Sequence, residues 1–261
     1  GWNHMGDMDL AEKMIKSCSE NGADYAKFQT WSVKRLKDGE WDSDGRRQIY
    51  ESAELTVEKH KRLIEVCKQN NVKFLSSVFS VEDAILLREL GVKEVKIPSF
   101  ECRNHELIEY CNQNFDRIFM STGTSVWEEV QESVSLIDKA ELALMHCVSA
   151  YPSLPENANI KKINNLKDIC ENVGYSDHIQ GVESAKVAIG LGACVIEKHF
   201  TVDQTLPGRD NKFAILPEQL KDLSDYIALL GSMCEWHGLN FQECERSSRE
   251  QYAGRFNDQE R

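Results

Sequence analysis

The chain has 261 residues, of which 41% are hydrophobic, and its formal net charge is −12. This length and apolar content suffice for one large core, and single α/β barrels commonly have this size. The negative charge argues against nucleic acid or a membrane surface as a partner, because both require a broad basic face. An anionic small substrate needs only a local cluster of Lys and Arg, so it is not excluded.

Nine cysteines are scattered along the chain without C-x-x-C spacing. Cys67, Cys147 and Cys194 stand inside apolar runs, which predicts reduced, buried thiols rather than a disulfide framework. The sequence shows no signal peptide and no apolar run of about 18 residues or more. We therefore expect a soluble, cytoplasmic protein in which residues 1–261 form a single domain.

Short apolar runs alternate with stretches of helical periodicity, the pattern of a parallel α/β domain. We expect Asp9 to cap the first helix and Gly22 to end it. Residues 30–56 are polar and too long for an ordinary connection, which is typical of a functional or disordered loop. The predicted strands are 25–29, 73–78, 94–97, 117–121, 142–146, 173–176 and 195–200, and the predicted helices are 9–21, 57–70, 81–90, 104–112, 126–139, 160–169, 182–191 and 217–232, with a last helical segment from about 241.

Seven strands are one fewer than an eight-stranded (β/α) barrel requires. Residues 1–7 are typical of the loop that leaves a strand, so we expect the first barrel strand to lie upstream of Gly1. A doubly wound sheet is the rival architecture. The candidate site residues all follow strands, which favours a barrel, because its active site collects at the carboxyl ends of all strands.

The stretch from Val173 to Asp210 contains the strongest local signal. Its two strands and the helix between them form a βαβ unit, so the strands are expected to be parallel neighbours. They lead to His178 and His199, whose imidazoles can therefore point at one place. Imidazole suits Mn, Fe, Co, Ni or Zn, and two protein nitrogens leave positions open for water and substrate. The alternative is that each histidine is an ordinary hydrogen-bonded residue at a strand end.

Two lysines and several hydroxyl groups follow other strands. A phosphate group requires fixed donors, an ammonium group and free backbone N–H groups, and the Ser121-Thr122-Gly123 turn is a candidate for the last of these. Each signal alone is weak, because such turns commonly cap helices and strand-end lysines commonly extend to solvent. Together they favour a site that combines phosphate and metal. The strand-end residues are Lys27, Gln29, Ser76, Ser77, Phe79, Lys96, Pro98, Ser99, Glu101, Ser121, Thr122, Gly123, His146, Ser149, Tyr151, Ser176, Asp177, His178, Glu197, Lys198 and His199.

A set of motifs, spread in order over residues 3–220, resembles the sialic acid synthase family, whose members make nonulosonic acids from phosphoenolpyruvate. The set is specific as a whole, although any one motif could arise by chance. The motifs are Asn3-His4 with Gly6-Asp7, Gly22-Ala23-Asp24 leading to Lys27-Phe28-Gln29, Lys96-Ile97-Pro98-Ser99 with Glu101, Ser121-Thr122-Gly123, His146-Cys147 with Tyr151-Pro152, Gly174-Tyr175-Ser176-Asp177-His178, and Glu197-Lys198-His199-Phe200.

The resemblance implies a (β/α)8 barrel that condenses phosphoenolpyruvate with an N-acyl mannosamine-type sugar. The products would be a nine-carbon 3-deoxy-2-ulosonic acid and phosphate. His178 and His199 would bind manganese or magnesium, which would act as Lewis acid and template. The resemblance further implies a homodimer. The implied catalytic residues are His178, His199, Lys96, Asp210 and Gln29, and the implied substrate-binding residues are Lys27, Ser77, Lys96, Ser99, Ser121, Tyr151, Ser176 and Asp210.

Several departures from the family pattern affect the choice of sugar. The family's glutamate before the Gly-x-Asn-His loop would precede Gly1, and the usual antifreeze-like C-terminal domain would follow Arg261. Ser149 stands where sialic acid synthases often have Asn, and Arg209 replaces a common Pro. The insert at 31–56 is closer to the legionaminate and pseudaminate branches.

Two rival functions remain open on the sequence. The first is another metal-dependent aldolase or a 3-deoxy-ulosonate-phosphate synthase, which needs a second phosphate site. Candidates for that site are Arg35, Arg46, Arg47 and Arg209. The second is a non-catalytic binding barrel, for which the Trp and Tyr residues at 31–50 would be a partner surface.

Overall fold

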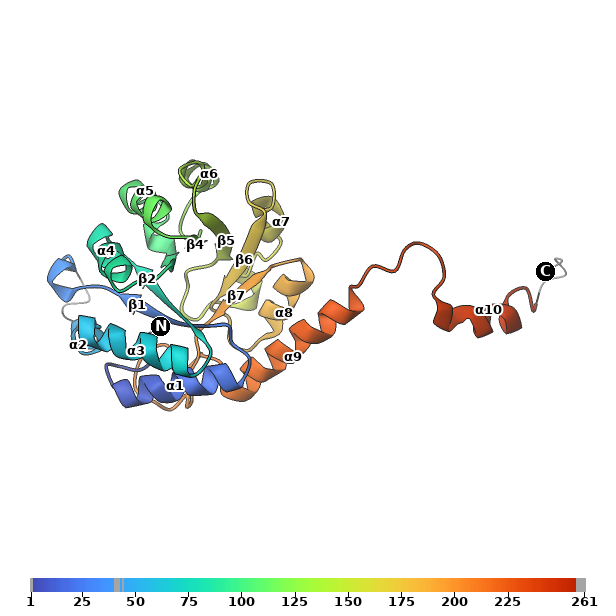
Figure 1. Ribbon diagram of the computed structural model, residues 1–261, viewed down its shortest axis with the longest axis horizontal. Helices are drawn as coiled ribbons and strands as arrows, with labels where there is room; N and C mark the ends of the chain where they lie inside the picture. Colours follow the sequence, from blue (N-terminus) through green and yellow to red (C-terminus); the bar gives the residue numbers. More distant parts are fainter. Residues whose placement is uncertain (1, 40–42, 44, 257–261) are drawn as a thin grey trace. The chain divides into compact units, whose positions relative to one another are not determined.

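The computed structural model describes residues 2–39, 43 and 45–256, and the chain divides into two compact units, residues 1–226 and 227–261. In the first unit seven parallel strands form one sheet in chain order, with helices around them (Figure 1). The seven predicted strands are confirmed, and the consecutive order excludes a doubly wound sheet. The strands are β1 (Tyr25–Thr30), β2 (Lys73–Val78), β3 (Glu94–Ile97), β4 (Arg117–Ser121), β5 (Glu141–Cys147), β6 (Asn172–Asp177) and β7 (Val195–Lys198).

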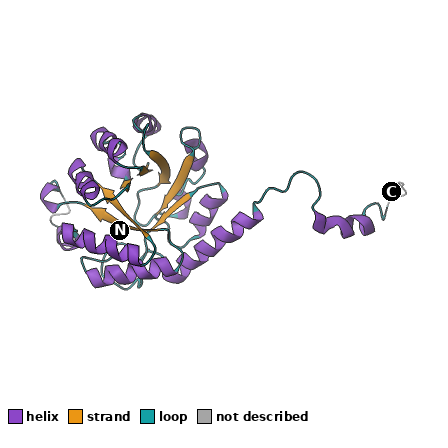
Figure 2. Cartoon of the chain, in the orientation of Figure 1, coloured by secondary structure: helices purple, strands orange, loops and turns teal. Residues whose placement is uncertain are grey.

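The helices alternate with the strands along the chain, as Figure 2 shows by colour. Short 3₁₀ turns follow several strands and carry some of the site residues. The α-helices are α1 (Met8–Glu20), α2 (Arg46–Ala53), α3 (Val57–Gln69), α4 (Val81–Glu89), α5 (His105–Asn114), α6 (Trp127–Ser135), α7 (Lys162–Leu166), α8 (Glu183–Gly190), α9 (Pro217–Met233) and α10 (Arg246–Tyr252), and the 3₁₀ turns are η1 (Val33–Arg35), η3 (Ser99–Glu101), η4 (Pro155–Asn157) and η5 (Glu243–Glu245).

Some predicted boundaries were wrong for local reasons. Asp7, rather than Asp9, caps α1, because its extended backbone lets the carboxylate accept from two N–H groups of the first turn. Residues 30–56 are not all loop, since they contain η1 and the short helix α2, most of which is half-buried or buried; residues 40–42 and 44 lie outside the described part. The strand β7 ends at Lys198, and Phe200 makes only an isolated bridge to Ile215.

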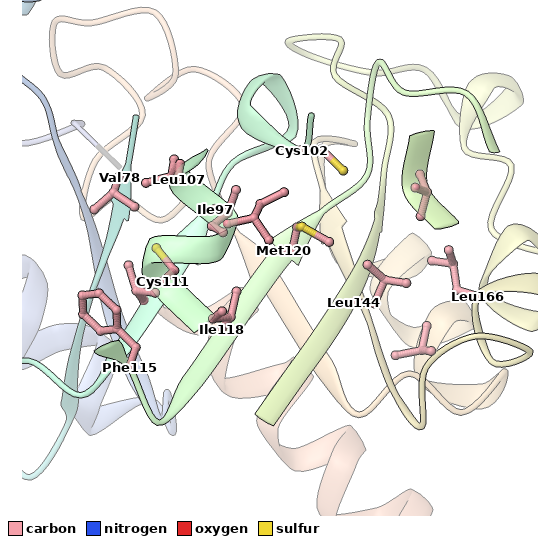
Figure 3. Close-up of a cluster of buried hydrophobic side chains, with 14 of the residues drawn as sticks. Val78, Ile97, Cys102, Leu107, Cys111, Phe115, Ile118, Met120, Leu144 and Leu166 are labelled. Atoms are coloured by element: carbon pink, nitrogen blue, oxygen red, sulfur yellow. The ribbon is translucent and has the colours of Figure 1, made fainter. Parts of the chain in front are cut away.

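The main core lies between the outer face of the sheet and the helices α4 to α8. Alternate strand residues point outward, so Ile97 and Ile118 contact the apolar faces of the helices (Figure 3). Leu107 and Cys111 of α5 belong to the same buried cluster. Fully burying a side chain such as Leu or Ile contributes about 1.5–3 kcal/mol, which holds each strand against its helix.

Contacts between side chains on the inner face show that the sheet is curved, so that its two edge strands, β1 and β7, approach each other. Tyr25 of β1 lies 5.4 Å, between ring centroids, from Phe119 of β4. A small apolar cluster joins Leu75, Phe119, Ala143 and Met145 with Tyr25 and Val195, side chains from β1, β2, β4, β5 and β7. The residues that follow these positions toward the carboxyl ends of the strands therefore share one interior space.

The cysteine prediction is confirmed for two of the three residues named. All nine cysteines are unpaired; Cys67 and Cys147 are buried, whereas Cys194 is exposed. Cys194 precedes β7 in a turn, where an apolar neighbourhood in sequence does not ensure burial. Among the described helices, none combines the length and apolar character needed to cross a bilayer.

The second unit contains the end of α9, followed by η5 and α10. Its described residues are exposed almost throughout. Large apolar side chains are among them, namely Ile227, Leu229, Met233, Trp236, Leu239, Phe241, Tyr252 and Phe256.

Candidate active site

A buried group of two lysines and one glutamate occupies the interior, one layer above the apolar cluster. Lys27, Lys96 and Glu197 stand two residues beyond Tyr25, Glu94 and Val195, so strand alternation turns them to the same inner face. Glu197 Oε1 lies 3.7 Å from Lys27 Nζ, and its Oε2 lies 3.3 Å from Lys96 Nζ. Two ammonium groups against one carboxylate give this group a net positive charge.

The charges of this group are set by burial and by mutual contact. Burial raises the pKa of the Glu197 carboxyl, but the ammonium groups of Lys27 and Lys96 outweigh it and hold the pKa well below its usual range. Burial lowers the pKa of Lys27, and the attraction of Glu197 opposes that shift. The carboxylate therefore stays ionised near neutral pH.

Hydroxyl groups from neighbouring strands surround the lysines. Lys96 Nζ lies 2.5 Å from Ser121 Oγ and Lys27 Nζ lies 3.3 Å from Ser77 Oγ. Ser176 Oγ donates to Glu197 Oε1 at 3.0 Å. The structure thus brings together the lysines and hydroxyls that the sequence placed at separate strand ends.

The Ser121-Thr122-Gly123 turn does not present free backbone donors, contrary to the expectation. The Thr122 N–H donates to Met145 O at 3.0 Å, and the Gly123 N–H donates to Ser99 Oγ at 3.1 Å. The turn is held by the neighbouring strand, because a buried N–H left unpaired would be costly. The turn therefore contributes the Ser121 hydroxyl to the site. Gly123, which has no side chain, also lets the hydroxyls of Ser99 and Ser149 lie close to the backbone.

Two imidazoles lie above the charged group, and their ring centroids are 5.3 Å apart. The Nδ1 atom of His178 donates a hydrogen bond to Val148 O at 3.1 Å, because a carbonyl oxygen can only accept. The ring of Tyr151 is 4.3 Å from that of His178 and 6.1 Å from that of His199. The predicted meeting of the two histidines is observed.

His199 has the surroundings of a neutral imidazole. Burial lowers its pKa well below the usual range, and the nearby His178 and Lys27 add to the effect. Among the described residues its buried Nδ1 makes no hydrogen bond of good geometry, although Asp210 Oδ2 lies 3.3 Å away. Asp210 also accepts a hydrogen bond of 2.6 Å from the indole N–H of Trp2.

These histidines can serve as ligands for one divalent ion. Imidazole nitrogens fit such an ion, and the buried Nδ1 of His199 has no hydrogen-bond partner among the described residues. In the part of the chain that the structure describes, no cluster of three or more His, Cys, Asp or Glu side chains has metal-ligand geometry. An ion here would therefore take its remaining ligands from water and substrate.

Of the other strand-end residues, three point away from this site, whereas Gln29 faces it. Outward-facing His146 contacts Ala158 O at 2.7 Å. Lys198 Nζ lies 3.0 Å from Asp177 Oδ2, and this ion pair is on the outer face of the sheet. Gln29 lies on the inner face of β1, opposite Ser77 in the register, and is half-buried.

The structure adds three residues to the site that the sequence analysis did not assign to it. Glu197 was visible at a strand end but had no role, although its spacing of two from His199 indicates the same face. Cys147 lies 3.8 Å from His178 Nδ1 and 3.7 Å from Ser149 Oγ. Trp2 reaches Asp210 across 208 positions of sequence, and no local signal predicts that contact.

The fold and geometry bring a net positive, hydroxyl-lined group and a candidate metal centre together at the carboxyl ends of parallel strands. The model of the NeuB family matches residues 14–235, so the chain belongs to that family. The N,N'-diacetyllegionaminic acid synthase of Campylobacter jejuni is 36% identical over 244 residues, which cover 87% of this chain and 73% of that protein. The pseudaminic acid synthase of the same species is 31% identical over 240 residues, covering 86% of this chain and 70% of that one.

A solved structure is similar over nearly the whole chain. The N-acetylneuraminic acid synthetase of Leptospira borgpetersenii, crystallised with citrate, has a TM-score of 0.87 and 31% identity. The match covers 99% of this chain and 90% of that one. The similarity therefore includes the strands that carry the site as well as the sequence motifs.

Proposed function

We propose that this protein is a nonulosonic acid synthase, which condenses phosphoenolpyruvate with an N-acyl mannosamine-type sugar. The observation that carries the proposal is the buried Lys27–Glu197–Lys96 group directly beneath the imidazole pair. A net positive, hydroxyl-lined interior suits a ligand that carries both a phosphate and a carboxylate. The names of the relatives support the same reaction class.

The bond changes assign separate tasks to the two layers of the site. C3 of phosphoenolpyruvate bonds to the aldehyde carbon of the open-chain sugar, water adds at C2, and the C2–O bond breaks to release phosphate. Lys27 and Lys96, with Ser77, Ser99, Ser121 and Ser176, hold the phosphate and carboxylate while this occurs. These side chains would hold phosphoenolpyruvate with its C3 atom near the imidazoles. Holding both reactants in one site removes much of the entropic cost of bringing them together.

The sugar would lie between the imidazole layer and the mouth of the site. Burial raises the pKa of the Tyr151 phenol, so it keeps its proton and can donate a hydrogen bond to the sugar. Asp210 and Gln29 offer an acceptor and an amide at the same level. The site thus holds the anion below and the neutral sugar above.

We also propose that His178 and His199 hold a divalent manganese or magnesium ion. The unsatisfied Nδ1 of His199 and the hydrogen bond that orients the His178 ring support this assignment. When bound, the ion supplies Lewis-acid polarisation of the sugar aldehyde. His178 and His199 would supply the imidazole nitrogens that hold the ion.

Three further proposals concern the complete molecule. An eighth strand between β1 and β7 would close the sheet into a (β/α)8 barrel, and the approach of Lys27 to Glu197 across these edge strands supports this. A homodimer would cover the exposed apolar side chains of residues 227–256. The unpaired, mostly buried thiols support a reducing, cytoplasmic location.

The test of the function is phosphate release from phosphoenolpyruvate with a panel of sugars. The panel contains N-acetylmannosamine, a mannosamine-type sugar with a second N-acetyl group at C4, and a phosphorylated aldose, each with and without manganese. We expect release with a non-phosphorylated N-acyl sugar, and the greatest release with the doubly acetylated one. Release with the phosphorylated aldose alone would favour a 3-deoxy-ulosonate-phosphate synthase.

A further inference from the structure

An aromatic cluster lies next to Asp210 and contacts it through Trp2. Trp2 lies 4.9 Å from Tyr50 and 6.0 Å from Trp31, between ring centroids. Trp31 in turn lies 5.6 Å from Tyr50 and 6.3 Å from Phe79. The cluster therefore joins the N-terminal loop, the end of β1, helix α2 and the end of β2.

The polar end of Trp2 points from this cluster to the site. Its indole Nε1 donates to Asp210 Oδ2 at 2.6 Å, and the same oxygen lies 3.3 Å from His199 Nδ1. Asp210 is 8% exposed, so the contact is shielded from water. No described residue donates a hydrogen bond to the other oxygen, Oδ1, which is left for a ligand or a bound water.

The two loops that carry these residues are fixed to each other. The Asn3 amide donates to Phe200 O at 2.9 Å, at the end of β7. The Asn211 amide donates to Pro207 O at 2.7 Å and approaches Asn3 O at 3.4 Å. The N-terminal loop therefore lies against the segment after β7, and the Trp2–Asp210 contact is part of a wider junction.

We propose that Trp2 is a positioning residue of this site: its indole N–H holds the Asp210 carboxylate beside His199, and packing against Tyr50 holds the indole. A short aspartate side chain on a loop has several rotamers of similar energy. A charge-assisted hydrogen bond from a packed ring selects one of them, and that choice directs Oδ1 to the sugar side. The role toward the sugar rests on the proposed function, whereas the hydrogen bond between Trp2 and Asp210 does not.

The chain offers a matched pair of variants. Trp2→Phe removes the N–H donor and keeps an aromatic ring in the cluster. Trp31→Phe makes the same chemical change in the same cluster, but the buried Trp31 Nε1 has no hydrogen-bond partner among the described residues. A difference between the two variants therefore reports the hydrogen bond rather than aromatic packing.

The first measurement needs no turnover. In a proton–nitrogen NMR spectrum of the full chain, the Trp2 indole resonance is identified by its absence in Trp2→Phe. We expect it far downfield, as for an N–H bonded to a carboxylate, and expect Asp210→Ala to move it strongly upfield. A Trp2 resonance that Asp210→Ala leaves in place would overturn the proposal, whatever the activity of the protein.

The second measurement separates positioning from general damage. We expect Trp2→Phe to lower kcat/KM for the sugar by about tenfold, with the KM for phosphoenolpyruvate changed less than twofold. Trp31→Phe should stay within about twofold of the wild type for both substrates. Equal losses in the two variants, or an equal loss for both substrates in Trp2→Phe, would contradict the proposal. If the wild-type protein turns over none of the sugars, the proposed function is refuted. The NMR measurement would then be the test of the role of Trp2.

Discussion

The Lys96 ammonium lies 3.3 Å from Oε2 of Glu197, in the interior of the curved sheet. Only 2% of the lysine side chain is exposed. A buried ion pair adds little to stability by itself, because desolvation offsets the attraction between the charges. The same carboxylate also contacts Lys27, so the group has one positive charge in excess, and for this reason we propose that it binds an anion.

Replacement of Lys96 by Met should weaken binding of phosphoenolpyruvate by about 10- to 100-fold, the range for loss of a charged hydrogen bond. Sugar binding should change far less, because the sugar is neutral. Steady-state KM values for both substrates check this. The control is Lys73→Met, an exposed lysine that pairs with Glu94 at the amino end of β2. Equal losses for both substrates in Lys96→Met would indicate a structural role.

Removal of the metal should abolish turnover. A strong chelator should stop phosphate release and added manganese should restore it, because two imidazoles provide the only protein nitrogens that we assign to the ion. His178→Ala should raise the manganese concentration needed for half-maximal activity by about 100-fold or more, since loss of an outer-shell partner alone costs 10- to 100-fold. His105→Gln, at an exposed position, is the control. Full activity in chelator would refute the metal assignment.

His4 should make the protein sensitive to acid. Burial lowers its pKa to about 4, and the neutral ring accepts a hydrogen bond from the Gly6 N–H at 3.1 Å. Because the folded pKa lies below the unfolded value of about 6.5, the unfolded state binds more protons in acid. The stabilisation is complete above pH 6.5 and is lost as the pH falls toward 4.

His4→Asn keeps an acceptor near Gly6 but does not titrate in this range. The difference in free energy of unfolding between wild type and variant should be about 2 kcal/mol smaller at pH 4.5 than at pH 7.5. Urea denaturation at the two pH values measures it. A difference that does not depend on pH would show that His4 is not held neutral.

Gly174 allows β6 and β7 to lie close together. A Cβ atom there would be 2.7 Å from Val195 O and 2.9 Å from Val195 Cβ, so Gly174→Ala should destabilise the fold by about 1–3 kcal/mol. Gly190 is the matched control, since it lies in α8 with open space around its Cβ position. Gly190→Ala should stabilise by about 0.5–1 kcal/mol. Denaturation midpoints that move the same way in both variants would contradict this packing.

The sequence predicted the strands well and the site in part, and the reasons are physical. Each strand is a short apolar run between helical stretches, so the sequence could place Lys27 and Lys96 near the carboxyl ends of their strands. The meeting of His178 and His199 followed from one βαβ unit. Local patterns could not show that β1 and β7 face each other, and the role of Glu197 depends on that closure. The contact between Trp2 and Asp210 is similarly a product of tertiary structure.

The central claim is tested most directly by the mass of the product. Protein incubated with phosphoenolpyruvate, manganese and the doubly acetylated mannosamine-type sugar should yield one new acid. Its mass should equal that of the sugar plus one pyruvic acid, and one phosphate should be released per product formed. Phosphate released without such an acid, or consumption of neither substrate across the sugar panel, would contradict the account.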